Sequence, residues 1–225
     1  MKRPVFVFLG LALVLAFGGA ALANTVTVTL TSAGGTVSND GSVYVGPYQL
    51  QLQAGDQTRI VNAPCDDYLD HISVGESWRA NEIPLTDFSS GLFGNEANAQ
   101  QKYWAAAYLT SLFGTSQYSN NDISFAIWGL FESEAQSNTQ NYDAVAGNLA
   151  SNALNLALSQ DSNLNEFKGW EILTPTQREG DGRPQEFLVP GGTPTPEPAT
   201  LALLGSGLLA VGLSWRNKRA SSTLA

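Results

Sequence analysis

The stretch Tyr48-Gln-Leu-Gln-Leu-Gln53 alternates polar and apolar side chains. This period of two is the spacing of a β-strand, in which successive side chains point to opposite faces. Leu50 and Leu52 therefore share one face, and we expect that face to be buried. Gly46-Pro47, just before the stretch, is a turn signal. The pattern predicts a domain rich in β-strands.

Similar patterns occur on both sides of this stretch. Thr25-Val-Thr-Val-Thr-Leu30 has the same alternation, and its β-branched residues favour strands. Short runs of the same kind predict further strands at residues 43–45, 59–61, 68–74, 170–173 and 186–189.

The middle third of the chain changes to a helical period. Residues 96–113 place apolar side chains three and four positions apart, which predicts an amphipathic helix. Two more helices are expected at residues 123–131 and 143–158, with Asn121 or Asp122 as the cap of the first. The order of strands, helices and closing strands predicts an α+β fold. We expect a β-rich domain, sandwich or barrel-like, with a three-helix insertion.

The first 23 residues have the pattern of a secretory signal peptide. Two basic residues open the chain, an apolar run follows, and Ala21-Leu-Ala23 is a small-residue cleavage site. We predict cleavage after Ala23, so that the exported chain begins at Asn24. The alternative is an uncleaved membrane anchor.

The C-terminal end contains a proline triplet, an apolar run and a basic cluster. The triplet Pro196-Glu197-Pro198 ends a Pro/Gly linker over residues 191–198, the uncharged run covers residues 199–215, and the tail over residues 216–225 carries Arg216, Lys218 and Arg219. A helix over the run would be about 26 Å long, close to the thickness of a bilayer core. Basic residues resist translocation. We therefore predict a transmembrane helix, with the single domain at residues 24–190 on the outer side.

This order of triplet, apolar helix and basic stop resembles the PEP-CTERM sorting signal of Gram-negative bacteria. The resemblance implies recognition by an exosortase, which is a membrane-embedded processing enzyme. It also implies a transient stay in the inner membrane and a final location at the cell surface or outside the cell, often in bacteria that produce exopolysaccharide. A plain C-terminal membrane anchor is the alternative interpretation.

The charge of the predicted domain excludes one class of partner. Residues 24–190 contain six of the eleven basic residues of the chain and nineteen of its twenty acidic residues. Nucleic-acid binding needs a basic surface, so we exclude it. The chain has one histidine and no CxxC motif, and we expect neither a metal site nor a cofactor.

Cys65 is the only cysteine, so no internal disulfide can form. A lone thiol in an exported protein indicates intermolecular pairing, a reactive group or a small buried residue. The negative charge of Asp66 and Asp67 disfavours a thiolate. We therefore predict a slow-reacting thiol, buried against the helical insertion with Trp128 or Ile127 as a neighbour.

The predicted domain also contains five short motifs in a fixed order. They are Gly46-Pro47-Tyr48, Cys65-Asp66-Asp67, Val74-Gly75-x-x-Trp78, Tyr103-x-x-Ala106-x-x-Leu109 and Ala126-Ile127-Trp128. Together they resemble the thioester-domain group of bacterial surface proteins. That resemblance implies a β-rich fold with a helical insertion, in which a cysteine and a glutamine form an internal thioester that captures a nucleophile. The cysteine corresponds to Cys65, but the glutamine position is Ser124, which has no carboxamide, so we do not expect the bond to form.

Residue types used by hydrolases are present without a catalytic pattern. Cys65 and His71 would be about 20 Å apart on an extended segment. Glu132 and Glu134 are expected at a solvated helix end. We therefore predict a non-catalytic structural or binding protein of the envelope or exopolysaccharide matrix, with polysaccharide or other matrix components as partners. A covalent adhesin acting through Cys65 and a polysaccharide-active enzyme are the alternatives.

Overall fold

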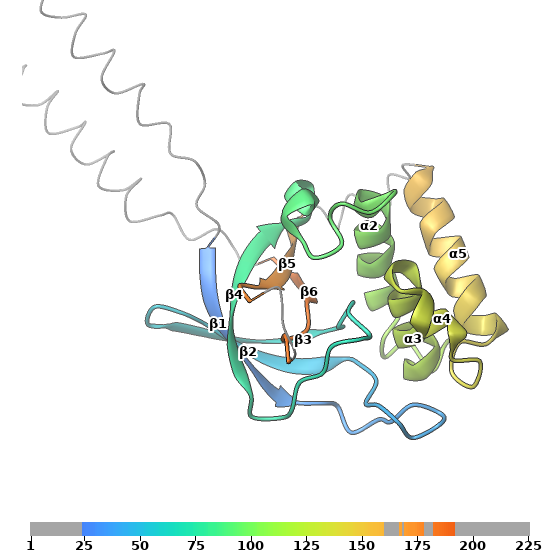
Figure 1. Ribbon diagram of the computed structural model, residues 1–225, viewed down its shortest axis with the longest axis horizontal. Coiled ribbons are helices and arrows are strands. Elements are labelled where there is room, and N and C mark those ends of the chain that lie inside the picture. Colours follow the sequence, from blue (N-terminus) through green and yellow to red (C-terminus); the bar gives the residue numbers. More distant parts are fainter. Residues whose placement is uncertain (1–23, 160–166, 168, 178–181, 192–225) are drawn as a thin grey trace, which may run out of the picture. The chain divides into compact units, whose positions relative to one another are not determined.

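Six antiparallel strands form one sheet in the order β3-β2-β1-β4-β5-β6 (Figure 1). A computed structural model describes residues 24–159, 167, 169–177 and 182–191. The strands are β1 (Asn24–Ser32), β2 (Tyr48–Ala54), β3 (Gln57–Ala63), β4 (Ser77–Pro84), β5 (Trp170–Pro175) and β6 (Phe187–Pro190).

The sheet curls until it is nearly closed, because its two edge strands, β3 and β6, contact each other. The segment after β3 completes the approach. The Asp66 backbone N–H donates to the Glu186 carbonyl at 3.3 Å, and the Leu188 N–H donates to the Pro64 carbonyl at 3.2 Å. We call residues 64–66 and 186–188 the seam. The sandwich-or-barrel alternative is thus resolved in favour of a barrel-like sheet.

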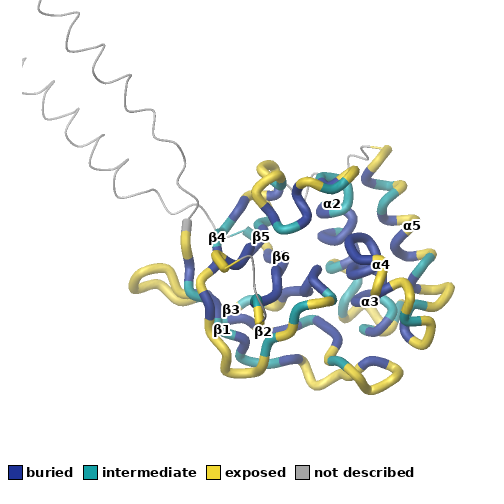
Figure 2. Tube along the Cα trace, viewed as in Figure 1, coloured by how far each residue is buried: buried dark blue, intermediate teal, exposed yellow. Residues whose placement is uncertain are grey.

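Alternation along the strands fills the interior of this sheet. Leu50 and Leu52 of β2 are buried, as their spacing predicts, and so are Val26 and Val28 of β1. The burial pattern in Figure 2 follows the same period. Each apolar side chain buried in this way stabilises the fold by about 1.5–3 kcal/mol relative to leaving it exposed.

The helices of the described residues occur between β4 and β5 in the chain and pack to one side of the sheet (Figure 1). They are a 3-10 segment at Leu85–Ser90 and the α-helices α2 (Ala99–Thr110), α3 (Asn120–Phe131), α4 (Ser133–Ser137) and α5 (Ala144–Leu158). The predicted three-helix insertion is present as α2, α3 and α5, with α4 as a short addition. Helix α3 is the most buried of them and forms the centre of a second core.

Ser119 caps α3, not Asn121 or Asp122 as expected. Its hydroxyl accepts a hydrogen bond from the Asp122 N–H at 3.1 Å, and the Asp122 carboxylate accepts one from the Ser119 N–H at 3.2 Å. This reciprocal pair is a capping box. Asp122 was therefore recognised as part of the cap, but at the third helical position.

Two predicted strands are absent from the described structure and one observed strand was missed. Residues 68–74 form a loop instead, because the Asp67 side chain accepts from the Asp70 N–H at 3.2 Å and holds a turn. Residues 43–45 contribute a single bridge between Val37 and Tyr44. Strand β4 escaped prediction because polar Asn81 and Glu82 interrupt its alternation.

The predicted signal peptide (residues 1–23), transmembrane helix (199–215) and basic tail (216–225) lie outside the described residues, as does the linker beyond Gly191. Within the described ranges, no helix combines the length and apolar character that a membrane crossing requires.

Candidate functional site

Cys65 lies in the middle of the seam. Its thiol donates a hydrogen bond to the Asp67 carbonyl at 2.8 Å and accepts one from the Asp67 N–H at 3.3 Å. The residue is only 2 % exposed, and burial raises the pKa of its thiol well above the usual range, aided by the charges of Asp67 and Asp66. The Trp128 indole, on α3, lies close enough to oppose part of this pKa rise, although its Nε1 makes no hydrogen bond among the described residues. The predicted burial of Cys65 against the helical insertion, with Trp128 beside it, is confirmed.

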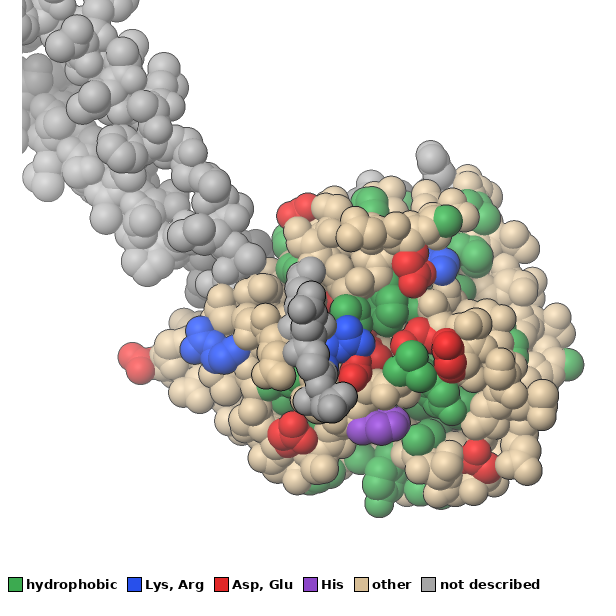
Figure 3. All heavy atoms as spheres, in the orientation of Figure 1, with side chains coloured by type: hydrophobic (Ala, Val, Ile, Leu, Met, Phe, Trp, Pro, Cys, Tyr) green, Lys and Arg blue, Asp and Glu red, His purple; other side chains and the backbone are tan. Residues whose placement is uncertain are grey.

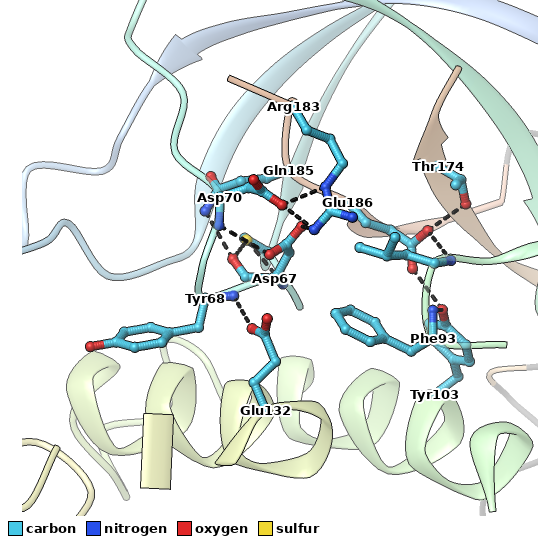
Figure 4. Close-up of polar contacts among 12 residues, drawn as sticks. Asp67, Tyr68, Asp70, Phe93, Tyr103, Glu132, Thr174, Arg183, Gln185 and Glu186 are labelled. Atoms are coloured by element: carbon cyan, nitrogen blue, oxygen red, sulfur yellow. Dashed lines mark hydrogen bonds and ion pairs between the residues drawn. The ribbon is translucent and has the colours of Figure 1, made fainter. Parts of the chain in front are cut away.

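Gln185 reaches the same carbonyl oxygen from the other side of the seam. Its Nε2 donates to the Asp67 carbonyl at 2.9 Å, and the residue is buried (Figure 4). The Asp67 carbonyl oxygen thus accepts hydrogen bonds from both the Cys65 thiol and the Gln185 carboxamide, which lie close together in the buried seam. Ser124, the position that the thioester resemblance assigns to a glutamine, instead accepts a hydrogen bond from the Gly46 N–H at 3.0 Å. No motif pointed to Gln185, because this residue comes from a distant part of the chain.

Glu186 ties the seam to the helical layer. Its carboxylate accepts hydrogen bonds from the Leu92 N–H at 2.8 Å, the Tyr103 hydroxyl at 2.6 Å and the Thr174 hydroxyl at 2.5 Å (Figure 4). Burial raises the pKa of Glu186, and these three donors oppose the rise. Three donors aimed at one carboxylate are the environment of an ionised group.

Asp66 is completely buried beside Glu186. Burial raises its pKa well above the usual range, and the negative charge of Glu186 raises it further. Two buried carboxyl groups this close do not both ionise at neutral pH. We therefore assign the proton to Asp66 and the charge to Glu186, whose donors favour the ionised form.

A second cluster of acidic residues lies around Arg183. The guanidinium forms ion pairs with Asp70 and, at 3.4 Å, with Asp67 (Figure 4). Burial still raises the pKa of Asp67 to about 8, with contributions from the charges of Glu132 and Asp70. Arg183 therefore lies against both carboxyl groups, while burial and the neighbouring carboxylates favour the protonated form of Asp67.

Glu132 is buried, so the prediction that it lies at a solvated helix end is wrong. It is 8 % exposed, and its carboxylate accepts a hydrogen bond from the Tyr68 N–H (Figure 4). Burial raises its pKa to about 7. Glu134, two residues later, is exposed as expected. Sequence alone could not separate the two, because α3 ends between Phe131 and Glu132 and turns one carboxylate inward.

A pocket of about 390 Å³ opens next to the seam. Four aromatic residues line it: Tyr44, Tyr48, Tyr68 and Trp128. Its polar lining comes from Ser42, His71, Ser73 and Gln185, and its apolar lining from Leu30, Ala33, Val43, Ile72 and Val74. The volume lies within the range of about 300–1,000 Å³ that is typical of small-molecule sites.

The pocket runs from an exposed rim to a buried floor. Tyr44 and Val74 are 53 % and 59 % exposed, whereas Trp128 is 2 % and Gln185 is 7 % exposed. Trp128 and Gln185 are also the residues beside the Cys65 thiol, so the floor adjoins the seam. Figure 3 shows the single histidine, in purple, next to hydrophobic side chains, in green, on this surface. Such an arrangement can hold a ligand that has both apolar and hydrogen-bonding parts.

No hydrogen bond joins Cys65 and His71 in the part of the chain that the structure describes. The Cys65 thiol is engaged with Asp67, and His71 is exposed at the pocket. Among the described residues, no group of three or more potential ligands is arranged to hold a metal ion.

The C-terminal segment supplies the other functional feature of the chain. Residues 194–219 match the family model of the PEP-CTERM protein-sorting motif. The match includes the triplet Pro196-Glu197-Pro198 and the basic residues Arg216, Lys218 and Arg219, so the predicted PEP-CTERM motif is confirmed. No curated protein and no solved structure matches the chain.

The PEP-CTERM motif implies export and membrane-associated sorting toward the cell surface or extracellular space. It also implies processing by an exosortase. The roles of individual motif residues, the cleavage after Ala23 and the domain limits stay predictions.

Proposed function

We propose that this protein is a non-catalytic binding protein of the cell surface or extracellular matrix, delivered by its PEP-CTERM motif. The observation that carries the proposal is the open, aromatic-lined pocket in a domain destined for export. The pocket is the place where the exported domain meets a matrix component.

The distribution of titratable groups supports a binding role. Glu186 and Asp67 are buried and held by structural donors or by Arg183. The Asp66 carboxyl group is buried as well and has no hydrogen-bond partner among the described residues. Cys65 is buried with a raised thiol pKa, which lowers the fraction of nucleophilic thiolate. Among the described lining residues, His71 is the one titratable group besides the tyrosines. The pocket therefore offers contact surface without a paired acid and base.

A double variant at the pocket rim and a control variant, both expressed in an exosortase-bearing host, test binding separately from delivery. Tyr44→Ala with Val74→Ala removes exposed side chains at the pocket rim, and we expect normal processing with reduced retention in the surface or matrix fraction. Ile60→Ala is the matched control, because Ile60 is 63 % exposed on β3 and lies outside the pocket lining. Equal retention of the rim variant and the control would refute the binding role of the pocket.

A second candidate function is covalent capture through a thioester between Cys65 and Gln185. The observation in its favour is the convergence of the Cys65 thiol and the Gln185 carboxamide on one carbonyl oxygen. In this reaction Cys65 Sγ attacks the Gln185 side-chain carbonyl carbon, the S–C bond forms, and the amide nitrogen leaves as ammonia with the thiol proton. The raised pKa of the thiol opposes the attack, which is why this function ranks second.

Intact-mass measurement on the exported protein tests the second candidate. Loss of ammonia lowers the mass by about 17 Da, and methylamine then adds to the Gln185 acyl group. The deficit must disappear in Gln185→Ala and persist in Gln136→Ala, since the Gln136 amide donates to the Gly129 carbonyl on α3. A full-mass protein with a free thiol eliminates covalent capture and leaves the first function.

A further inference from the structure

Among the residues that the structure describes, the lining of the pocket contains no Asp, Glu, Lys or Arg. A charged ligand would lose its hydration there without gaining an opposite charge, which is costly. The acidic excess of the domain also repels anionic polymers. The pocket chemistry therefore selects a neutral ligand.

The aromatic walls are fixed before any ligand arrives. The rings of Tyr68 and Trp128 lie 5.3 Å apart, and Phe125 packs against both, at 5.7 and 4.9 Å. Tyr48 packs edge-on against Phe187 at 5.8 Å and donates its hydroxyl to the Tyr44 carbonyl at 2.6 Å. Rigid rings lose little entropy on binding, so they favour a ligand that presents a flat apolar face.

The polar side chains that line the pocket favour a ligand that also carries hydrogen-bonding groups. The Gln185 amide nitrogen and the Ser42 hydroxyl already donate to Asp67 and Asp40. His71, Ser73 and the side-chain oxygen of Gln185 line the same pocket and can hydrogen-bond a ligand. A lipid chain has no groups to meet them. A pyranose ring has both features, because its C–H face packs on aromatic rings and its hydroxyls surround that face.

Exposed apolar side chains continue beyond the pocket mouth. Val37, 51 % exposed, pairs with Tyr44 in a β-bridge, and Tyr44 itself stands at the rim. This surface extends the contact past one sugar unit. We propose that the pocket binds one unit of a neutral polysaccharide, with the adjoining unit on the Val37–Tyr44 rim, an inference that rests on the proposed binding function.

Native gel electrophoresis with polysaccharide in the gel tests the inference. The full chain, in a zwitterionic detergent without a sugar head group, is run through gels that contain laminarin, dextran, hydroxyethylcellulose, galactomannan or anionic polygalacturonate. We expect retardation by at least one neutral polymer and none by polygalacturonate. Tyr44→Ala should weaken that binding roughly three- to tenfold, the scale of one aromatic contact, while Ile60→Ala leaves it unchanged.

The remaining outcomes overturn the inference in distinguishable ways. Retardation by polygalacturonate alone, or by a neutral polymer equally in Tyr44→Ala and Ile60→Ala, refutes a neutral-sugar pocket. Nile red serves as a neutral apolar probe of the same pocket. If Nile red binds with Tyr44 dependence and no polysaccharide does, the sugar assignment fails and the binding function stands. If neither probe binds, both fail.

Discussion

Removing one hydroxyl, with Tyr103→Phe, tests how strongly Glu186 ties the helical layer to the seam. The Tyr103 hydroxyl donates to the Glu186 carboxylate at 2.6 Å and accepts from the Phe93 N–H at 3.0 Å. Tyr103 and Glu186 are both 0 % exposed. The substitution keeps the ring and its packing and deletes two buried hydrogen bonds.

The expected loss follows from those two contacts. A hydrogen bond to a charged group contributes about 1.5–3 kcal/mol, and a buried N–H left without a partner costs about 1–3 kcal/mol. Glu186 still accepts hydrogen bonds from Leu92 and Thr174 in the variant, so its carboxylate keeps two donors. We expect Tyr103→Phe to lower the free energy of unfolding by about 3–4 kcal/mol, which is large for a single substitution.

Urea unfolding of the exported protein, followed by circular dichroism, measures this change. Tyr118→Phe is the matched control, because the Tyr118 hydroxyl contacts the Gln117 amide at an exposed position. The control should stay within about 0.5 kcal/mol of the wild type. A Tyr103→Phe protein as stable as Tyr118→Phe would refute the assignment of Glu186 as the link between the seam and the helices.

Three further predictions concern pH, the thiol and sorting. The pKa values of Glu132 and Asp67 are raised in the fold to about 7 and 8, so the protonated forms are favoured there. The contribution of these two groups to the free energy of unfolding is full below about pH 4 and is lost as pH rises through 7 and 8, so Tm should fall between pH 5 and 9. Glu132→Gln should make that fall in Tm smaller, whereas the control Glu134→Gln should leave it unchanged. Cys65 should label slowly in native buffer and rapidly in denaturant, and Cys65→Ser should cost about 1–3 kcal/mol of stability; fast native labelling or a Cys65-linked dimer would contradict the buried thiol. Replacing Pro196-Glu197-Pro198 by alanines should leave an unprocessed form in the inner membrane, which cell fractionation with immunoblotting detects. Normal processing of this variant would contradict the sorting role of the triplet and favour a plain membrane anchor.

Periodicity predicted those parts of the fold in which local pattern and burial agree. Leu50 and Leu52 of β2 and the apolar face of α3 were placed correctly because one buried face repeats at the period of its element. The loop at residues 68–74 was not, because a side-chain hydrogen bond from Asp67 overrides its strand-like composition. Local pattern carries no information about such a competition.

The site was predictable only where one residue carried the signal. Cys65 stands out as the sole cysteine, and the charges next to it predicted a slow-reacting thiol. Gln185, Glu186 and Arg183 could not be linked to it, since closure of the barrel-like sheet alone brings them to the segment after β3. The inward turn of Glu132 likewise depends on where α3 ends.

The position of the seam also keeps delivery and binding independent. Every residue that lines the pocket lies between Leu30 and Gln185, and the seam ends at Leu188. The PEP-CTERM match begins at residue 194, beyond β6, which ends at Pro190 with its carbonyl bound to Arg59 of β3 at 3.1 Å. Processing within the matched segment therefore removes none of the described residues that line the pocket or surround Cys65. In the function that we propose, an exosortase releases the domain with all of these residues in place.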